Sequence, residues 1–270
     1  QLKVHALIIF LLSFSLAPFY LLLVVSFKNP VQYRAEPWAL SFPLRFQNYA
    51  AAWEIIQPFI WNTIFVAIVG LTGVLVLSII GGYVFSQLEF PFKGILYFMI
   101  VALLMVPWVL SFIPSYLLYY SLGLLDSQWA LILSNVAGSP IFGIFLLRTL
   151  MEGIPKELFE AARVDGANVV TELLRIALPL SLPGIATLAT INFVNTWNSF
   201  LWPLVVIHTS SKQVISVGIY QLSQGVGSTG LVNWGPLFAG FVIASIPLII
   251  VFIFLGKFYI EGLTASGLKV

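Results

Sequence analysis

Residues 148–178 read RTLMEGIPKELFEAARVDGANVVTELLRIAL, and they interrupt an otherwise apolar chain. The sequence of 270 residues holds 12 Lys and Arg and 10 Asp and Glu, and nine of these charged residues fall in this one stretch. Such a density of charge cannot lie in hydrocarbon, where each ionised side chain is costly. Residues 148–178 are therefore predicted to be a polar loop between two membrane segments. Its charged residues are Arg148, Glu152, Lys156, Glu157, Glu160, Arg163, Asp165, Glu172 and Arg175.

The composition of the whole chain supports this interpretation. Hydrophobic residues make up 60% of the sequence and charged residues 8%. Soluble domains carry about 25% charged residues, so this chain has too few to cover a water-facing surface. The net charge of +2, without a basic patch, gives no indication of nucleic-acid binding. The absence of cysteine excludes disulfides, thiolate metal sites and a cysteine nucleophile.

Six charge-free runs are long enough to cross a bilayer, which requires about 20 apolar residues per helix. Because every backbone polar group must be satisfied in lipid, each run is predicted to be a helix. The first run lacks a small-residue cleavage site and is followed by further spans, so we expect it to be a membrane helix rather than a removed signal peptide. The predicted all-α spans are 6–27, 61–86, 94–118, 128–148, 180–205 and 235–256.

Six spans place both termini on one side of the membrane. If that side is the cytoplasm, the inner segments hold eight Lys and Arg and the outer segments four. The positive-inside rule then predicts cytoplasmic termini and a cytoplasmic loop at 148–178. We divide the chain into the first helix with an outer interfacial segment (1–60), a five-helix core that includes the loop (61–256), and a cytoplasmic tail (257–270).

Within the loop, turn-forming residues predict two short helices. Pro155 suits the first turn of a helix, and Gly166 suits its C-terminal end. Asn168 can cap a second helix that runs to Leu178, and Pro179 then marks the return to the membrane. An ordinary connection would need only a few residues. A loop of this length, with the small residues Ala161 and Ala162 in mid-helix, favours a docking surface over a plain solvated loop. Expected ion pairs within the first helix are Lys156 with Glu160 and Glu160 with Arg163.

The fifth span carries the densest polar group of the membrane region. At 100° per residue, Asn192, Asn195, Thr196 and Ser199 share one face, with Asn198 at its edge. Amides in lipid must face protein or water. The group can therefore hold the helix bundle together, or line a solute path, or do both. In the third span, Pro107 and Pro114 permit kinks that are either packing irregularities or bends along a pathway.

The first outer segment, 28–60, is polar and aromatic, and we expect it to end in a short helix at 47–56. It is either a membrane-interface anchor, the interpretation we favour, or a contact for an external partner. Tyr116, Tyr119 and Tyr120 are expected in an aromatic belt.

The spans contain none of the ionisable groups that proton-coupled carriers need, and the sequence has no phosphate-binding loop or HExxH motif. A transporter of this kind must therefore obtain its energy from another subunit.

The loop resembles the EAA loop of ABC-importer permeases. The residues that carry the likeness are Glu160-Ala161-Ala162, Asp165-Gly166-Ala167 and Ile176-Ala177-Leu178-Pro179. The carbohydrate branch, relatives of the maltose permease G subunit, is indicated by Ile154–Leu158, Arg163–Ala167, Trp197–Leu204 and Gly262–Ala265. Asn48-Tyr49 and Leu122–Asp126 also fit, so the likeness covers nearly the whole chain. Ser199 departs from the pattern, since many relatives carry Asp there.

This resemblance implies a type I ABC-importer permease in a prokaryotic plasma membrane, and not an enzyme. It implies as partners a second, homologous permease, two ATPases that bind ATP and Mg, and an extracytoplasmic solute-binding protein; this chain itself would hold no cofactor. The residues implied to contact the ATPase are Glu157, Glu160, Ala161, Ala162, Arg163, Asp165, Gly166 and Ala167, with Gly262, Leu263, Thr264 and Ala265 of the tail. Candidate solute-pathway residues are Asn192, Asn195, Asn198, Ser199 and Trp202.

Three functions remain open from the sequence. The favoured one is the permease of an ATP-driven importer for a sugar or oligosaccharide, whose coupling loop links ATPase closure to alternating access. The second is an ABC-importer permease for a different solute. The third is a stand-alone channel or membrane scaffold whose loop packs only internally.

Overall fold

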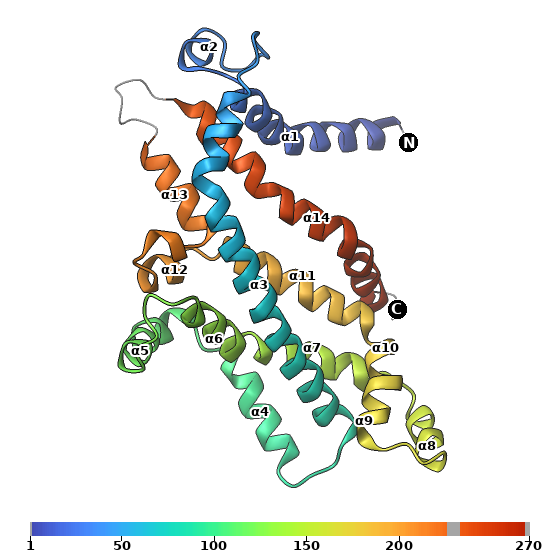
Figure 1. Ribbon diagram of the computed structural model, residues 1–270. Helices are drawn as coiled ribbons and strands as arrows, with labels where there is room; N and C mark the ends of the chain where they lie inside the picture. The colour runs from blue at the N-terminus through green and yellow to red at the C-terminus, as the bar shows by residue number, and fades with distance from the viewer. Residues whose placement is uncertain (1, 226–232, 268–270) are drawn as a thin grey trace. The chain divides into compact units, whose positions relative to one another are not determined.

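The computed structural model describes residues 2–225 and 233–267, with only the backbone described for residues 2, 225 and 257–267. All the elements assigned in these residues are helices, as the sequence predicts (Figure 1). The chain divides into two compact units, residues 1–62 with 213–249 and residues 63–212 with 250–270, and each is described by itself. The helices α3 and α14 contribute residues to both units.

The helices that are long and apolar enough to cross a membrane match the predicted spans. Four unbroken helical stretches of this kind occur in the described residues, or up to six if each of two bent pairs counts as one span. The four are α1 (Leu2–Ser26), α3 (Gln47–Gln87), α6 with α7 (Gln128–Gly138 and Pro140–Glu152) and α14 (Trp234–Gly267). The upper count of six agrees with the sequence-based prediction.

Two of the predicted spans are bent pairs of helices, and in the third span a kink was expected at its prolines. The third span is α4 (Lys93–Leu103) and α5 (Trp108–Ser121), which meet at 94°. Pro107 has no N–H to donate and adopts an extended backbone, so the helix stops before it and restarts after it. The fifth span bends by 75° between the segment 169–180 and α11 (Leu182–Asn198). A short α12 (Leu201–Val206) follows, so the predicted span 180–205 has about the right ends but is interrupted at residues 199–200.

In the first unit, the segment after α1 folds back onto the start of α3. The Asn48 side chain donates hydrogen bonds to the carbonyls of Ser26 and Lys28, at 2.8 and 2.9 Å. The Phe27 ring packs against Phe46 and Tyr49, with ring centroids 5.2 and 5.0 Å apart. The predicted separate helix at 47–56 is therefore wrong, because these residues are the first turns of the 41-residue α3. The short α2 (Pro30–Ala35) and α13 (Ile215–Gly225) complete this unit with part of α14.

In the second unit, the C-terminal half of α3 packs tightly against α6 and α7 (Figure 1). Glycines on α3 allow this approach, as small residues commonly do between membrane helices. A Cβ on Gly82 would lie 2.8 Å from Leu147 Cβ and 3.1 Å from the Arg148 backbone nitrogen. Gly70, Gly73 and Gly81 make similar close contacts with Asn135, Val136 and Ile144.

Candidate functional site

The polar loop folds as a helix, a glycine turn and a second helix. Pro155 precedes α8 (Lys156–Val164), and Gly166 ends it with a φ of +83°. The Ala167 N–H donates to the Ala162 carbonyl at 2.8 Å, which satisfies a carbonyl at the helix end. Asn168 Oδ1 accepts a hydrogen bond from the Thr171 N–H at 2.9 Å and caps the next helix. The predicted roles of Gly166 and Asn168 in the local structure are confirmed.

The second helix of the loop differs from the prediction near its end. It consists of α9 (Val169–Glu172), a π-helical turn η1 (Leu173–Ala177) and α10 (Leu178–Leu180). Pro179 lies inside α10, and the bend comes later, at Ser181. Short π-helical insertions are rare and occur often at functional sites.

The two faces of α8 have different surroundings. Glu157, Glu160, Ala161 and Val164 are spaced i, i+3, i+4 and i+7, which places them on one side of a helix. All four are exposed, and the exposed fraction of Val164 reaches 88%. In the part of the chain that the structure describes, the carboxylates of Glu157 and Glu160 form no ion pair. We call these four residues the outer face of α8. It carries unpaired negative charge beside small and apolar side chains.

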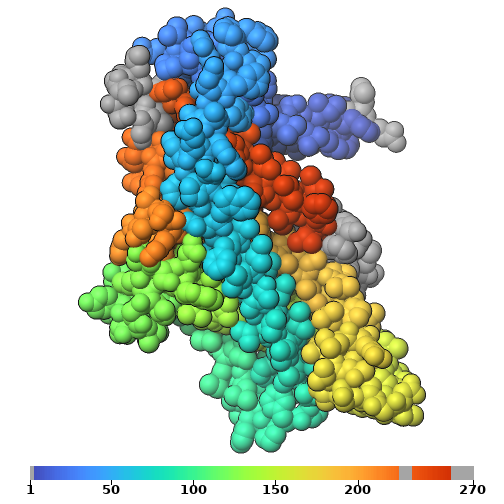
Figure 2. Space-filling model, viewed as in Figure 1, coloured from blue at the N-terminus to red at the C-terminus, as the bar shows by residue number. Residues whose placement is uncertain are grey.

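The inner face of α8 holds the helix to the second unit. Phe159 is buried in an apolar cluster, and its ring lies 6.4 Å from that of Tyr83 on α3. Figure 2 shows the segment 156–180, in yellow, at the surface beside the C-terminal part of α3. The other members of the cluster are Leu147, Met151, Ile154, Ala177, Ile185 and Leu188.

Arg163, whose side chain is half exposed, reaches from α8 to pair with the buried Glu172. Arg163 Nε lies 2.8 Å from Glu172 Oε1, and Arg163 Nη2 lies 3.1 Å from Glu172 Oε2. The Tyr83 hydroxyl donates a further hydrogen bond to Glu172 Oε2, at 2.8 Å. The hydrogen bond to Glu172 raises the pKa of the Arg163 guanidinium. The predicted pair of Glu160 with Arg163 is wrong, because the guanidinium instead reaches across the Gly166 turn to Glu172.

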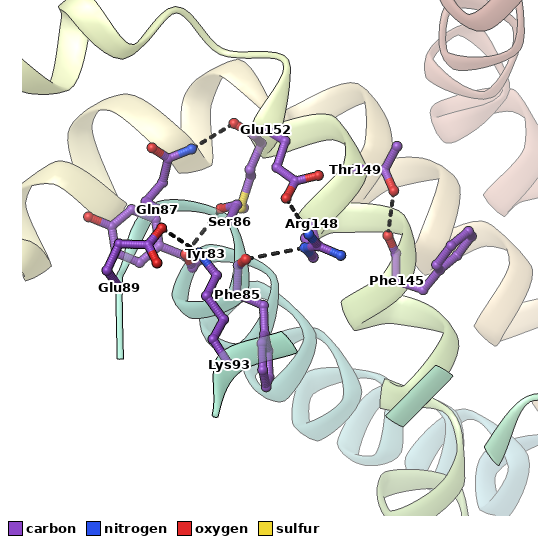
Figure 3. Close-up of polar contacts among 11 residues, drawn as sticks. Tyr83, Phe85, Ser86, Gln87, Glu89, Lys93, Phe145, Arg148, Thr149 and Glu152 are labelled. Carbon is purple, nitrogen blue, oxygen red and sulfur yellow. Dashed lines mark hydrogen bonds and ion pairs between the residues drawn. The ribbon is translucent and has the colours of Figure 1, made fainter. Parts of the chain in front are cut away.

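A second set of contacts joins the ends of α3 and α7 (Figure 3). Arg148 pairs with Glu152 at 2.6 Å, donates to the Phe85 carbonyl at 3.2 Å, and covers the Tyr97 ring at 3.7 Å. The Gln87 side chain donates to the Met151 carbonyl at 2.8 Å. Arg148 therefore uses its charge in contacts within the second unit. The outer face of α8, in contrast, is accessible.

The second unit also contains a cavity of about 760 Å³ beside the bend between α4 and α5. Its lining combines aromatic rings, hydroxyl groups and amides. Rings come from Trp108, Phe112, Phe142 and Trp202, hydroxyls from Ser111, Ser115, Ser134 and Ser139, and amides from Asn192 and Asn195. Pockets of this size, mostly apolar with a few polar groups, are typical of small-molecule sites.

The candidate solute-pathway residues separate into two groups. Asn192, Asn195 and Trp202 line the cavity, whereas Asn198 donates to the Val194 carbonyl on its own helix at 2.9 Å. Ser199 follows the end of α11 and is not among the lining residues.

Asn192 also binds Asn135 on α6, with its Nδ2 3.0 Å from Asn135 Oδ1. Asn135 Nδ2 further donates to Thr196 Oγ1 at 3.0 Å, and Ser139 Oγ donates to Asn135 Oδ1 at 2.6 Å. Amides of the fifth span therefore join the bundle, while Asn195 adds polarity to the cavity wall.

Several residues of these sites were missed at the level of sequence. Tyr119 packs edge-on against Trp202, with ring centroids 5.5 Å apart, and is buried rather than part of an exposed belt. Asn135 carries an isolated amide within an apolar span. Such an amide predicts a polar partner on another helix, and this partner is Asn192. Ser111 and Ser115 are spaced i, i+4, which predicts one shared face of the bent third span.

Asp126 joins two loops in the same unit. Its carboxylate accepts hydrogen bonds from the backbone N–H groups of His208 and Thr209 at 3.0 and 2.8 Å. It also accepts a hydrogen bond from the Thr209 hydroxyl at 2.7 Å and pairs with Lys212 at 3.0 Å. These donors, Thr209 foremost, hold the pKa of the Asp126 carboxyl well below its ordinary value.

The candidate tail residues Gly262–Ala265 lie in α14, where side chains are outside the described part of the structure.

Comparison with known proteins gives consistent matches. A family model described as "Binding-protein-dependent transport system inner membrane component" matches residues 75–263. The diacetylchitobiose uptake system permease protein NgcG of Streptomyces coelicolor is 31% identical over 92% of this chain and 82% of its own length. The arabinooligosaccharides transport system permease protein AraQ of Halalkalibacterium halodurans is 33% identical over 77% of this chain and 72% of its own length.

A solved structure shares the fold. A chain of a bacterial ABC transporter involved in the import of the acidic polysaccharide alginate superposes with a TM-score of 0.84 at 23% identity. The match covers 96% of this chain and 95% of that chain. At this level of identity the likeness establishes the fold.

Proposed function

Since this chain belongs to the family of binding-protein-dependent transport system inner membrane components, we propose that it is the membrane-spanning permease subunit of an ATP-driven importer for a sugar or oligosaccharide. The carbohydrate class is supported by the names of two relatives, which refer to diacetylchitobiose and to arabinooligosaccharides. The chemistry of the cavity agrees, because a neutral sugar needs hydroxyl and amide partners and aromatic faces, and it needs no intramembrane charge.

The outer face of α8 is the observation that carries the proposal. The exposed side chain of Val164 and the unpaired carboxylates of Glu157 and Glu160 stand on a helix that packs on its other side through the buried Phe159. On this proposal an ATPase subunit covers that face, and a basic residue of the ATPase meets Glu160. ATP and Mg bind in the ATPases, and this chain contributes no catalytic group.

The orientation and the remaining partners belong to the same proposal. The polar loop and both termini face the cytoplasm, as the excess of Lys and Arg on that side favours. A second permease subunit completes the translocation pathway, and a solute-binding protein delivers the substrate from outside. One relative in structure was solved in complex with an alginate pentasaccharide-bound periplasmic protein, with a TM-score of 0.63. In this chain the solute contacts are placed at Asn195, Trp202 and the cavity serines.

Charge reversal on the outer face tests the proposal. Glu160→Lys is expected to reduce the amount of ATPase that co-purifies with the tagged chain, because the introduced positive charge then faces the basic residue of the ATPase. The matched control is Glu54→Lys, an exposed position in the first unit with the same change of charge. Western blotting of the membrane fraction checks that both variants are inserted equally.

Two outcomes would contradict the proposal. A wild-type chain that purifies without any ATPase would favour the stand-alone channel or scaffold. Equal ATPase recovery with Glu160→Lys and with wild type would remove the outer face of α8 from the interface. Uptake of radiolabelled disaccharides and oligosaccharides, compared with labelled amino acids, then separates a sugar importer from an importer of another solute.

A further inference from the structure

We propose that Arg163, Glu172 and Tyr83 form a clamp that fixes α8 to α3, so that a displacement of α8 moves α3 with it. The inference rests on the proposed function for the origin of the displacement, namely an ATPase bound to the outer face of α8. It assigns Glu172 and Tyr83, which the loop motif does not include, a positioning role. It also gives the half-exposed Arg163 a partner within the permease, the buried Glu172.

The first support is the convergence of three segments on one carboxylate. Arg163 is contributed by α8, Glu172 by α9 and Tyr83 by α3. Both oxygens of Glu172 are occupied, one by Arg163 Nε and the other by Arg163 Nη2 and the Tyr83 hydroxyl. A two-point contact between guanidinium and carboxylate fixes orientation as well as distance.

The second support is burial. Glu172 is 2% exposed and Tyr83 is 1% exposed, and among the described residues Glu172 is the one buried carboxylate. A buried carboxylate that loses its partner destabilises the folded state. The carboxylate therefore strongly favours the arrangement in which Arg163, and with it the C-terminal turn of α8, stays in place.

The third support is how little else holds α8. The helix has nine residues and is followed by the Gly166 turn. Phe159 is its one fully buried side chain. A single apolar anchor allows a short helix to pivot. The clamp lies one turn further along the helix, and it supplies the second fixed point that prevents this rotation.

The choice of α3 as the receiving helix is consistent with the other contacts at its end. Tyr83, Phe85 and Gln87 lie in its last turns, and the latter two bind Arg148 and Met151 of α7. The close packing of Gly82 against Leu147 adds a rigid contact between the same two helices. A displacement of α8 is therefore transmitted to α3 and α7, which move together.

A double variant separates this role from a purely stabilising one. Arg163→Met alone leaves Glu172 charged and unpaired, and it is expected to lower folded yield. The double variant Glu172→Leu with Tyr83→Phe removes the buried carboxylate together with the buried hydroxyl that donates to it, so neither group is left without a partner. Arg163 keeps its charge, which water can solvate because half of its side chain is exposed. The double variant is expected to fold with wild-type yield while lacking the clamp. The control is Glu89→Gln with Lys93→Met, which removes an exposed ion pair that does not touch α8.

The measurement is a distance between α8 and α3 by double electron–electron resonance. The chain has no cysteine, so spin labels at Leu158→Cys and Ile80→Cys, both exposed positions away from the outer face of α8, are the only ones in this chain. The sample is the complex that co-purifies with the tagged chain, nucleotide-free and trapped with ATP and vanadate. We expect one narrow distribution in both states for wild type and for the control. We expect a broader distribution in the double variant, which shifts on trapping.

Two results would overturn the clamp. One is a double variant whose distribution matches wild type in both states. The other is a wild-type distance that itself changes on trapping, since α8 would then move without α3. If no ATPase co-purifies, the proposed function fails, and the width of the nucleotide-free distribution in the double variant still decides whether the clamp exists.

Discussion

At the scale of single residues, Gly166 has the most specific backbone requirement in the polar loop. Its φ is +83°, and a Cβ there would meet no other atom within 4 Å. The constraint is therefore conformational and not steric crowding. A left-handed backbone costs a residue with a side chain about 1–2 kcal/mol, and β-branched residues tolerate it least.

We predict that Gly166→Val reduces ATPase activity of the assembled complex without preventing membrane insertion, because the α8–α9 turn is distorted. Asn adopts the left-handed backbone more readily than other residues, so Gly166→Asn is the matched control and should retain most activity. The measurement is ATP hydrolysis per purified complex in proteoliposomes. Equal activity of the Val and Asn variants would contradict this account of the turn.

Asp126 provides a prediction about pH. An Asp carboxyl has an ordinary pKa of about 3.9, and its hydrogen bonds with Thr209 and Lys212 lower that pKa in the folded protein. The stabilisation is therefore fully present above the ordinary value and is lost as the pH falls through the folded value.

We predict that Asp126→Asn lowers the melting temperature of the detergent-purified protein equally at pH 7 and pH 5. Below about pH 3.9 the difference from wild type should shrink, because the carboxyl is then protonated in the unfolded chain while it stays ionised in the folded protein. The difference should be lost as the pH falls through the lowered pKa of the folded state. Thermal unfolding followed by tryptophan fluorescence measures this. A difference that already disappears between pH 7 and pH 5 would show that the carboxylate does not act through these donors.

At the scale of elements, the contact between α3 and α7 depends on the absence of a side chain. A Cβ at Gly82 would lie 3.1 and 3.2 Å from backbone atoms of Arg148 and Leu147, which cannot move aside as a side-chain tip can. Gly94, in the first turn of α4, has no atom within 4 Å of such a Cβ. The two glycines therefore differ in packing although both lie in helices.

We predict that Gly82→Val reduces the folded yield severalfold by separating α3 from α7, and that Gly94→Ala leaves it unchanged or slightly higher, since Ala favours helix over Gly. Fluorescence-detected size-exclusion chromatography of tagged variants measures the yield. A well-folded Gly82→Val protein would mean that the two helices can separate at little cost.

The bends of the third and fifth spans are also features of elements. Pro107 was visible in the sequence as a site without a backbone donor. The bend angles of 94° and 75° could not be predicted from the sequence. A proline in a membrane helix permits a range of bend angles, and packing against neighbouring helices selects one of them. The cavity beside the α4–α5 bend exists because the helix turns there instead of continuing.

At the scale of the whole molecule, the proposed topology makes a labelling prediction. In a chain without native cysteine, Val170→Cys should react with a membrane-impermeant maleimide only after the cells are permeabilised. Ser210→Cys, on the opposite side in this topology, should react in intact cells. Both positions are exposed, so access through the membrane is the difference measured. The reverse pattern would overturn the orientation derived from the positive charges.

The sequence alone determined the class of molecule and the approximate position of its spans. It also determined the first helix of the polar loop, its glycine turn and the cap of its second helix. These features depend on hydrophobicity, charge density and turn chemistry, which act between residues close in the chain. Only the tertiary structure decided which polar groups meet. Glu172 lies nine positions from Arg163 and 89 from Tyr83, and Asn192 lies 57 positions from Asn135. Such pairs form because packed helices bring distant residues together and because a buried polar group must find a partner.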